Sequence, residues 1–323
     1  MESCALRFKG QAEGTWGNKV SHLSHFICFC EYYGVQDFPL QLGTLLRFIA
    51  ILARTSLAFG TANNILGSVR YFTSFLDPSS VNLFSSILVS AEIKGLKAQL
   101  SRPVRQKLPF TVAHLIKFHS LINIDNVRHL AAWCAMLLAF FGCFRLSNLV
   151  PLSKNKFDPS KQLRISDVKF SGDLVLIFYK WSKTNQNSSK VTWIPVHCVG
   201  DNRFNLKSHF VSLFTKVNAP LDSPLFSYGP NAFLSRASLV KILDNVVCEA
   251  GLSPADYSWH SFRRGAAVFA FELGLPDSAV QLLGDWSSGA FKNYLEFSFL
   301  RKVSVSQKLA KSFEKQINFI YKN

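Results

Sequence analysis

Apolar side chains in the first part of the chain recur at helical spacing, in segments that glycine and proline separate. In the first segment they recur every three or four positions, at Trp16, Val20, Leu23, Ile27 and Cys30. Gly34 is the expected end of this helix, and Pro39 the expected start of the next. A break with an N-cap is expected at Gly60 and Thr61, and a fourth helix after Pro78. The pattern predicts a small helical bundle.

The stretch at residues 101–110, SRPVRQKLPF, lacks such periodicity. It is basic and contains two prolines, which favour an extended connection over a helix. We interpret it as a linker between a domain of residues 1–100 and a second domain of residues 111–323.

The second domain mixes helical and β patterns. Thr111 is placed to cap a helix, and the longest apolar helix is expected at Val127–Phe141. Further amphipathic helices are expected at residues 205–217 and 235–250. Three short segments are typical of strands: Leu163–Val168, Leu174–Tyr179 and Lys190–Pro195. The expected fold is therefore mainly α, with an N-terminal helical bundle and an α+β domain that contains a small antiparallel sheet.

The charge of the chain indicates what kind of partner it binds. The chain of 323 residues has a net charge of +16, and its first hundred residues hold only 8 Lys and Arg against 6 Asp and Glu. Most of the excess positive charge therefore belongs to the second domain. A polyanion such as nucleic acid is the natural partner of such a surface, although a solvated basic surface would look the same. No apolar run is long enough to span a membrane, so we expect no membrane contact.

Cysteine usage indicates a reducing compartment. The seven cysteines are odd in number and show no paired CxxC spacing, so reduced thiols are expected in place of a disulfide framework. No secretory leader is evident at the start of the sequence. Two histidines and two cysteines, which are possible zinc ligands, lie close together in the sequence at His22, His25, Cys28 and Cys30. Their spacing matches no common zinc finger, so no metal is expected there.

The segment Trp259–Tyr294 carries the strongest chemical pattern in the chain. His260 and Arg263 are three positions apart, so on a helix both side chains project from one face. Interleaved phenylalanines and alanines would hold that helix in a core. Gly274 and Pro276 end the helix, and a second short one is expected at residues 279–283. Two large aromatic residues follow, Trp286 and Tyr294.

Each of these residue types suits attack on a phosphodiester. The phenol of Tyr294 is an oxygen nucleophile that can form a covalent phosphotyrosine. Arg263 offers a planar fork of donors for the charge that develops on the phosphate oxygens. His260 can accept a proton or donate a hydrogen bond, and Trp286 offers one indole N–H. Any one of them alone would more often be structural, but the four occur together in order.

The form HSFRRGAA…GDWSS…Y resembles the C-terminal motif of the tyrosine recombinases, and most of all those of eukaryotic mobile elements, the crypton and DIRS-like groups. The resemblance implies a second catalytic arginine after an apolar helix, which Arg145 matches. An unpaired buried arginine would be costly, so Arg145 is either paired or functional. Many members carry an acid three positions later, where this chain has Asn148. Whether a carboxylate or an amide orients Arg145 is left open.

The resemblance also implies a catalytic lysine on a β-hairpin turn. Lys183 matches it, with Lys180 as the competitor and Lys190 as a weaker third choice. It implies as well a core-binding domain that grips one side of the DNA duplex. The candidate phosphate contacts are basic residues of the bundle and the linker: Lys19, Arg47, Arg54, Arg70, Lys94, Lys97, Arg102, Arg105 and Lys107.

The activity implied is site-specific cleavage and rejoining of DNA strands through a 3′-phosphotyrosine, with no cofactor, nucleotide or metal. The alternatives are DNA relaxation of the type IB topoisomerase kind and a domesticated, catalytically silent DNA-binding protein. A terminal apolar stripe, at Val305, Leu309, Phe313 and Ile317, suggests a helix that docks in trans on a neighbour in a homotetramer. The resemblance to eukaryotic elements implies the nucleus.

Overall fold

The computed structural model describes residues 13–76, 82–102, 106–181, 192–284, 286 and 292. The chain forms two compact units, Met1–Arg105 and Gln106–Asn323. Each unit has its own cluster of buried apolar side chains. The division falls inside the stretch that we interpreted as a linker. In the described part of the chain, no helix is long and apolar enough to cross a membrane.

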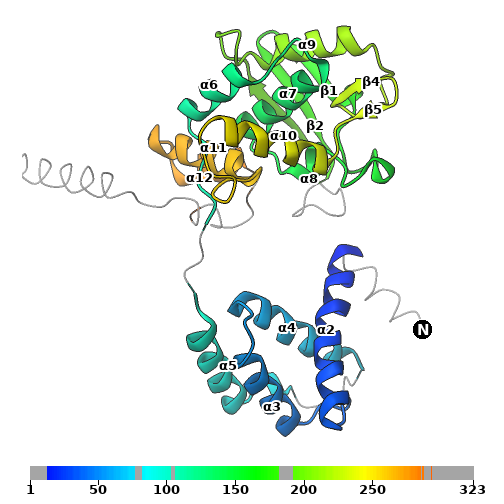
Figure 1. Ribbon diagram of the computed structural model, residues 1–323, viewed down its shortest axis with the longest axis vertical. Coiled ribbons are helices and arrows are strands. Elements are labelled where there is room, and N and C mark those ends of the chain that lie inside the picture. The colour runs from blue at the N-terminus through cyan, green and yellow to red at the C-terminus, as the bar shows by residue number, and fades with distance from the viewer. Residues whose placement is uncertain are drawn as a thin grey trace, which may run out of the picture. The chain divides into compact units, whose positions relative to one another are not determined.

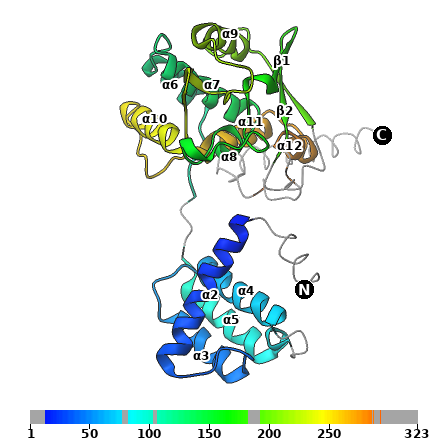
Figure 2. The same ribbon diagram turned by 90° about the vertical axis from the view of Figure 1, so that its right-hand side faces the viewer.

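The first unit is a bundle of four described α-helices (Figures 1 and 2). They are α2 (Glu13–Tyr33), α3 (Leu42–Ala53), α4 (Phe59–Leu76) and α5 (Ile87–Leu100), with a short 3-10 turn at Leu83–Ser85. Helix α2 packs on α4, and α3 packs on α5. Gly34 follows α2 with a φ of 61°, as its predicted stop requires. The break predicted at Gly60 and Thr61 is wrong, because both residues lie in the first turn of α4. The predicted start at Pro78 lies outside the described residues.

The second unit is organised around α7 (Val127–Phe141), which Figure 1 shows in its middle. Its residues from Leu130 to Phe140 are all buried, and it packs on α9 and α11. The side chain of Asn126 caps its first turn. The remaining helices are α6 (Val112–Leu121), α8 (Leu146–Leu149), α9 (Leu206–Val217), α10 (Arg236–Glu249), α11 (His260–Glu272) and α12 (Asp277–Leu283).

A three-stranded antiparallel sheet has the order β1-β2-β3. Its strands are β1 (Val168–Ser171), β2 (Leu174–Tyr179) and β3 (Thr192–His197). Gly172, with a φ of 55°, makes the β1–β2 turn possible. A small two-stranded sheet pairs β4 (Ser227–Gly229) with β5 (Ala232–Phe233). The prediction of a mainly helical chain with a small antiparallel sheet is confirmed.

One strand prediction is wrong in position. The apolar segment predicted as a strand at Leu163–Val168 is mostly an extended stretch followed by a 3-10 turn at Ile165–Asp167. Another 3-10 turn, at Lys154–Lys156, precedes this segment. The strand β1 begins only at Val168, where the first segment was expected to end. The reason is the buried carboxylate of Asp167, which accepts a hydrogen bond from the backbone N–H of Arg164 at 2.8 Å and closes the turn.

Residues 106–110 begin the second unit and pack on the rest of it. The N–H of Leu108 donates to the carbonyl of Asp256 at 2.8 Å, and the N–H of Phe110 donates to that of Ser261 at 3.0 Å. The ring of Phe110 is fully buried and stacks on Tyr257. This part of the stretch that we interpreted as a linker is therefore a fixed segment of the second unit, beside the start of α11.

Candidate active site

Arg145 stands at the N-cap of α8, where the buried helix α7 has just ended. The turn between them is tight. A Cβ at Gly142 would lie 2.5 Å from the ring of Phe144, and Cys143 has a φ of 50° in the left-handed region. Backbone strain of this kind is found where the fold fixes a functional residue. The turn carries the partly buried Arg145 out of the core.

Arg263 lies on α11 and is almost completely buried. Its Nη1 donates to the backbone carbonyl of Cys143, and its Nη2 donates to that of Gly284 at 2.6 Å. The first of these acceptors is two residues before Arg145. The two arginines, far apart in the sequence, are thus joined through one turn of backbone.

Trp286 is buried, and the guanidinium carbon of Arg263 lies 4.1 Å from the centre of its ring. This is a cation–π contact in a site that excludes water, where such contacts are strongest. The glycine of the GDW motif makes it possible, because a Cβ at Gly284 would lie 2.0 Å from the Trp286 ring. The side chain of Gln281 fixes Trp286 further by donating to its carbonyl at 2.7 Å. Trp286 therefore holds Arg263 from one face.

Arg145 and His260 line one cavity of about 470 Å³. Basic and hydroxyl side chains make up much of its polar lining, from Lys107, Ser147, Arg236 and Ser258, with Asp244 as its acid. Loss of hydration and the positive charges of Arg263, Arg145 and Arg264 lower the pKa of His260. At neutral pH the imidazole is therefore uncharged and can accept a proton. The cavity brings together the predicted pair Arg145 and His260, while the buried Arg263 is not among the residues that line it.

No carboxylate in the described part of the chain forms an ion pair with Arg145. Asn148 is buried, and its amide donates to the carbonyl of Trp181 at 2.8 Å. Its Oδ1 has no hydrogen-bond partner among the residues that the structure describes. The side chain that stands in the place of the usual acid thus holds Trp181, two residues after the end of β2, and makes no hydrogen bond to Arg145.

Of the three candidate catalytic lysines, the structure describes Lys180 alone. Lys180 is held in a buried ion pair with Asp167 and also donates to the carbonyl of Pro159 at 3.0 Å. Lys183 and Lys190 lie outside the described residues, and so does Tyr294. Among the groups near Arg263, burial raises the pKa of the Cys143 thiol to about 12, which leaves it protonated and a poor nucleophile.

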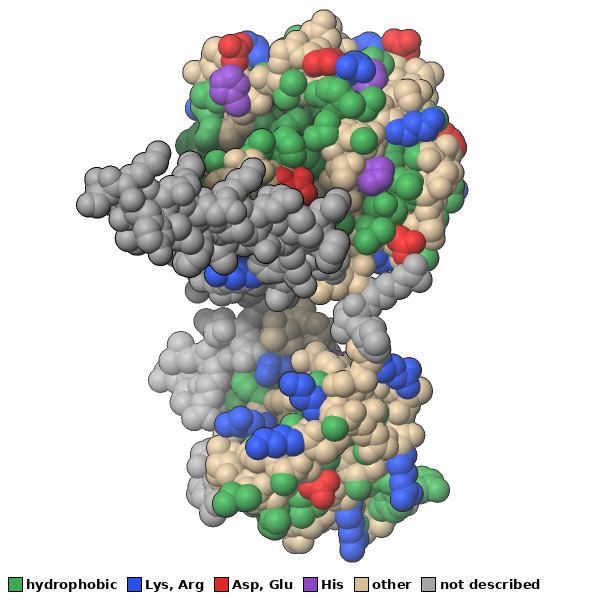
Figure 3. Space-filling view, turned by 90° about the vertical axis from the view of Figure 1, so that its left-hand side faces the viewer, with side chains coloured by type: hydrophobic (Ala, Val, Ile, Leu, Met, Phe, Trp, Pro, Cys, Tyr) green, Lys and Arg blue, Asp and Glu red, His purple; other side chains and the backbone are tan. Residues whose placement is uncertain are grey.

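The candidate DNA contacts of the first unit lie on its surface. Exposed residues are Arg47, Arg54, Arg70, Lys94, Lys97 and Arg102. Figure 3 shows several Lys and Arg side chains on one face of this unit, with few acidic ones among them. Lys19 is different, since its ammonium lies 3.8 Å from the centre of the Tyr71 ring and burial lowers its pKa. Lys107 is half-buried and donates to the carbonyl of Ala255 at 2.7 Å, and Arg105 lies outside the described residues.

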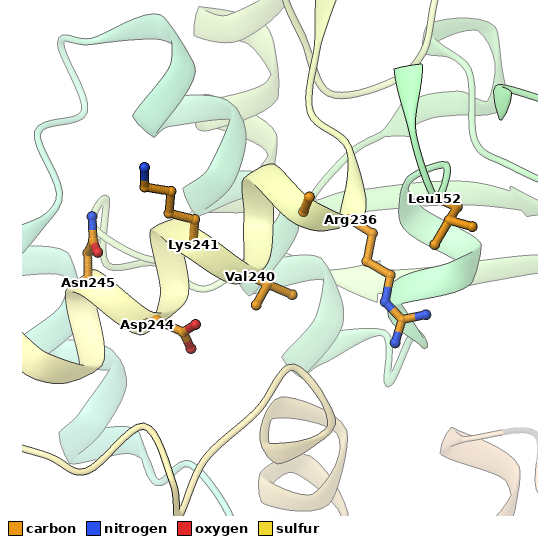
Figure 4. A pocket seen from close by; sticks show the side chains of 7 residues that line it. Leu152, Arg236, Val240, Lys241, Asp244 and Asn245 are labelled. Atoms are coloured by element: carbon orange, nitrogen blue, oxygen red, sulfur yellow. The ribbon is translucent and has the colours of Figure 1, made fainter. Parts of the chain in front are cut away.

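Two features were missed at the level of sequence. Arg264, the second arginine of the FRRG motif, is buried and donates to the carbonyl of Lys107 at 2.6 Å. The sequence did contain a signal for it: Arg264 is a second positive charge next to Arg263 in a helix rich in alanine and phenylalanine. Such a helix is expected to be largely buried, so its charged side chains need a partner. The other feature is a cavity of about 550 Å³ along the solvent side of α10, where Figure 4 shows Arg236, Lys241 and Asp244. Charged residues at such spacing are common on the solvent-exposed face of any helix, so the sequence pattern did not distinguish these three as a site.

Comparisons with known proteins bear on the fold. No protein-family model matches the sequence. Among curated proteins, the chain is similar to an integrase/recombinase XerD homologue of Selenomonas ruminantium, with 23% identity over 275 residues that cover 81% of this chain and 75% of that protein.

Two solved structures are similar over most of the chain. One is the Tn1549 transposon integrase in complex with transposon right end DNA, with a TM-score of 0.63 and 15% identity over 95% of this chain and 97% of that one. The other is a lambda integrase tetramer bound to a Holliday junction, with a TM-score of 0.58 and 15% identity over 90% of this chain and 74% of that one. At such identities the likeness shows the fold alone, which this chain shares with these integrases.

Proposed function

We propose that this chain is a tyrosine recombinase, which cuts and rejoins DNA strands through a covalent 3′-phosphotyrosine. The observation that carries the proposal is the cavity that Arg145 and His260 line together, with the buried Arg263 close enough for its charge to lower the pKa of His260. Arg145 makes no ion pair with a described carboxylate, so its charge remains for a ligand. A DNA phosphate is an anion of the right kind, and arginine binds it through two parallel hydrogen bonds.

In the proposed reaction the phenolic oxygen of Tyr294 attacks the scissile phosphorus. The new O–P bond forms as the bond to the 5′ oxygen breaks, and His260 takes the phenolic proton. Its lowered pKa supports this role, because a base must be unprotonated at the working pH. Arg145 stabilises the charge on the phosphate oxygens by hydrogen bonds, and Arg263, whose two terminal nitrogens are bonded to backbone carbonyls, stabilises it through its positive charge. Rejoining is the same step in reverse with a new 5′-hydroxyl, so neither nucleotide nor metal is consumed.

Lys183 is the proposed general acid for the departing 5′ oxygen. The ion pair between Lys180 and Asp167 supports this choice, because Lys180 already has two protein acceptors for its ammonium. The same contact, with that of Asn148 to Trp181, fixes residues 180 and 181 just after β2, two positions before Lys183 in the sequence. The lysine can then reach a phosphate from a strand that is itself fixed.

Double-stranded DNA is the proposed partner, and a homotetramer the proposed assembly. The solved relatives support both, because one is an integrase with transposon end DNA and another is a tetramer on a Holliday junction. Trans docking of the C-terminal helix needs an apolar acceptor. Exposed large apolar side chains at the end of α11 and on α12 offer one: Phe269, Leu273, Leu275, Leu282 and Leu283.

The proposed setting is a mobile element of a eukaryote, with the nucleus as its compartment. The form HSFRRGAA…GDWSS…Y is the basis for this, because it resembles the crypton and DIRS-like recombinases. The likeness to a transposon integrase supports the mobile element in general terms. The odd number of cysteines without paired CxxC spacing supports a reducing compartment.

The experiment that tests the function uses DNA that carries the ends of the chain's own element. The purified protein is incubated with two such duplexes in excess EDTA, without nucleotide, and strand exchange is followed on a denaturing gel. We expect joined products under these conditions. Products that form only after Mg²⁺ is restored would indicate a metal-dependent mechanism and contradict the proposal.

A further inference from the structure

A strap of backbone, residues 107–110, lies against the segment that carries His260. Its N–H groups at Leu108 and Phe110 donate to the carbonyls of Asp256 and Ser261. The approach at α11 is close, because a Cβ at Gly265 would lie 2.0 Å from the carbonyl oxygen of Phe110. The strap begins where the second unit begins, directly after the division at Arg105.

Arg264 fastens the strap from the side of α11. It lies four positions after His260, so both side chains share one face of the helix. Helical side chains lean toward the N-terminus, and that of Arg264 therefore reaches back over the first turn. There its Nη1 donates to the carbonyl of Lys107 at 2.6 Å. The guanidinium is 3% exposed, so this bond lies in a medium where a hydrogen bond to a charged group is strong.

His260 is surrounded by charge from each element around it. Arg263 and Arg264 come from α11 itself, and Arg145 from the start of α8. The cavity that His260 lines adds Lys107 from the strap, Arg236 and Asp244 from α10, and the hydroxyl of Tyr257. Arg264 is one of three arginines whose charges lower the pKa of His260, after loss of hydration. Arg264 thus binds the backbone of Lys107, which lines the same cavity as His260, and its charge acts on the imidazole.

We propose that Arg264 is a positioning residue for His260, which it serves by locking the strap 107–110 onto the first turn of α11. It is assigned no contact with a substrate, since its Nη1 binds the strap and its side chain is not among those that line the cavity of Arg145 and His260. This proposal rests on the proposed role of His260 as the base.

The test compares Arg264→Met, which removes both charge and donors, with Arg264→Lys, which keeps the charge. Lys216→Gln, at an exposed position on α9, is the control for the loss of one charge. The first readout is the titration of His260 by NMR in the full chain without DNA, assigned with His260→Gln. The second is the single-turnover cleavage rate against pH. Hydrogen exchange at the amides of Leu108 and Phe110 is the third.

For Arg264→Met we expect a higher pKa of His260, since a neighbouring positive charge has been removed. The acid limb of the rate profile then moves to higher pH, the rate falls on the order of tenfold to a hundredfold, and the two strap amides exchange faster. Arg264→Lys keeps the low pKa of His260 and loses protection of the strap only in part, and it supplies the test if Arg264→Met does not fold.

A variant that cleaves more slowly with an unchanged pKa of His260 would overturn the proposal and leave Arg264 a purely structural residue. An Arg264→Met protein with wild-type rate and strap protection would overturn it as well. The titration and the exchange need no DNA cleavage. They therefore still test the role of Arg264 if the chain proves not to be a recombinase.

Discussion

At the scale of single residues, the two predicted arginines are held in different ways. Arg263 is fixed by the carbonyls of Cys143 and Gly284 and by the ring of Trp286. Arg145 makes no ion pair with a described carboxylate, and it lines the cavity beside His260. Arg263 is therefore pre-organised by the fold, while Arg145 has no such bond to a described carboxylate and faces the cavity. Preorganised donors contribute most to catalysis because they need no reorganisation during the reaction.

Replacing Arg145 by lysine tests this assignment. The change keeps the charge but removes the planar fork, so we expect the single-turnover cleavage rate to fall by about 10²–10³-fold. DNA affinity should fall much less, because one phosphate contact is retained as a point charge. Arg128→Lys, at an exposed position on α7, is the matched control and should cleave like the wild type. Equal cleavage by the two variants would remove Arg145 from the site.

The choice of lysine is tested with a sulfur substitution in the DNA. Lys183→Ala should slow cleavage strongly, and a 5′-bridging phosphorothiolate should restore the rate, because a thiolate leaves without a proton donor. Lys180→Ala is the control from the same hairpin. It breaks the buried pair with Asp167, so it should lower stability and show no specific rescue. Rescue of the Lys180 variant alone would reverse the assignment.

At the scale of elements, helices were easier to predict than strands for a physical reason. The apolar period of α7 is long and unbroken, and its bounds at Val127 and Phe141 match the prediction. The start of β1 was missed because a local carboxylate, Asp167, decides it, and periodicity does not report such a bond. In the same way the contact of Asn148 joins residues 33 positions apart, so no local pattern could show that its amide holds Trp181.

Close packing of α11 on the strap gives an element-scale prediction. In Gly265→Ala the new Cβ would meet the Phe110 carbonyl, so we expect a loss of about 1–3 kcal/mol in the free energy of unfolding of the second unit. Gly95→Ala in α5 is the control, because nothing lies within 4 Å of its Cβ position. There helix propensity alone should raise stability by up to about 1 kcal/mol. Urea unfolding measures both, and a stabilising Gly265→Ala would contradict the packing.

At the scale of the whole molecule, order along the chain was more informative than composition. The motifs at Arg145 and His260 predicted which distant segments meet, and one cavity contains both. The sequence could not show that the linker ends before residue 107, because residues 107–110 form hydrogen bonds with residues about 150 positions away. The roles of Lys183 and Tyr294 stay predictions, since both lie outside the described residues.

Deletion of the residues after Val303 tests the proposed assembly. If the apolar stripe docks on a neighbour, the truncated chain should bind a single site with nearly unchanged affinity but lose synapsis and recombination. Gel shifts with one and with two sites separate these steps. A shortened chain that still recombines, or one whose isolated protomer unfolds, would contradict docking in trans.

The nucleophile is the central claim, and the covalent adduct tests it most directly. Wild-type protein incubated with its own DNA site should give an SDS-resistant complex, and mass spectrometry of the digested complex should place the nucleotide on Tyr294. Tyr294→Phe should bind the same DNA and give no complex. Tyr257 is a poor substitute, because burial and the charge of Asp256 raise its pKa and its ring stacks on Phe110. An adduct that persists in Tyr294→Phe, on Tyr257, Tyr321 or any other residue, would contradict the account.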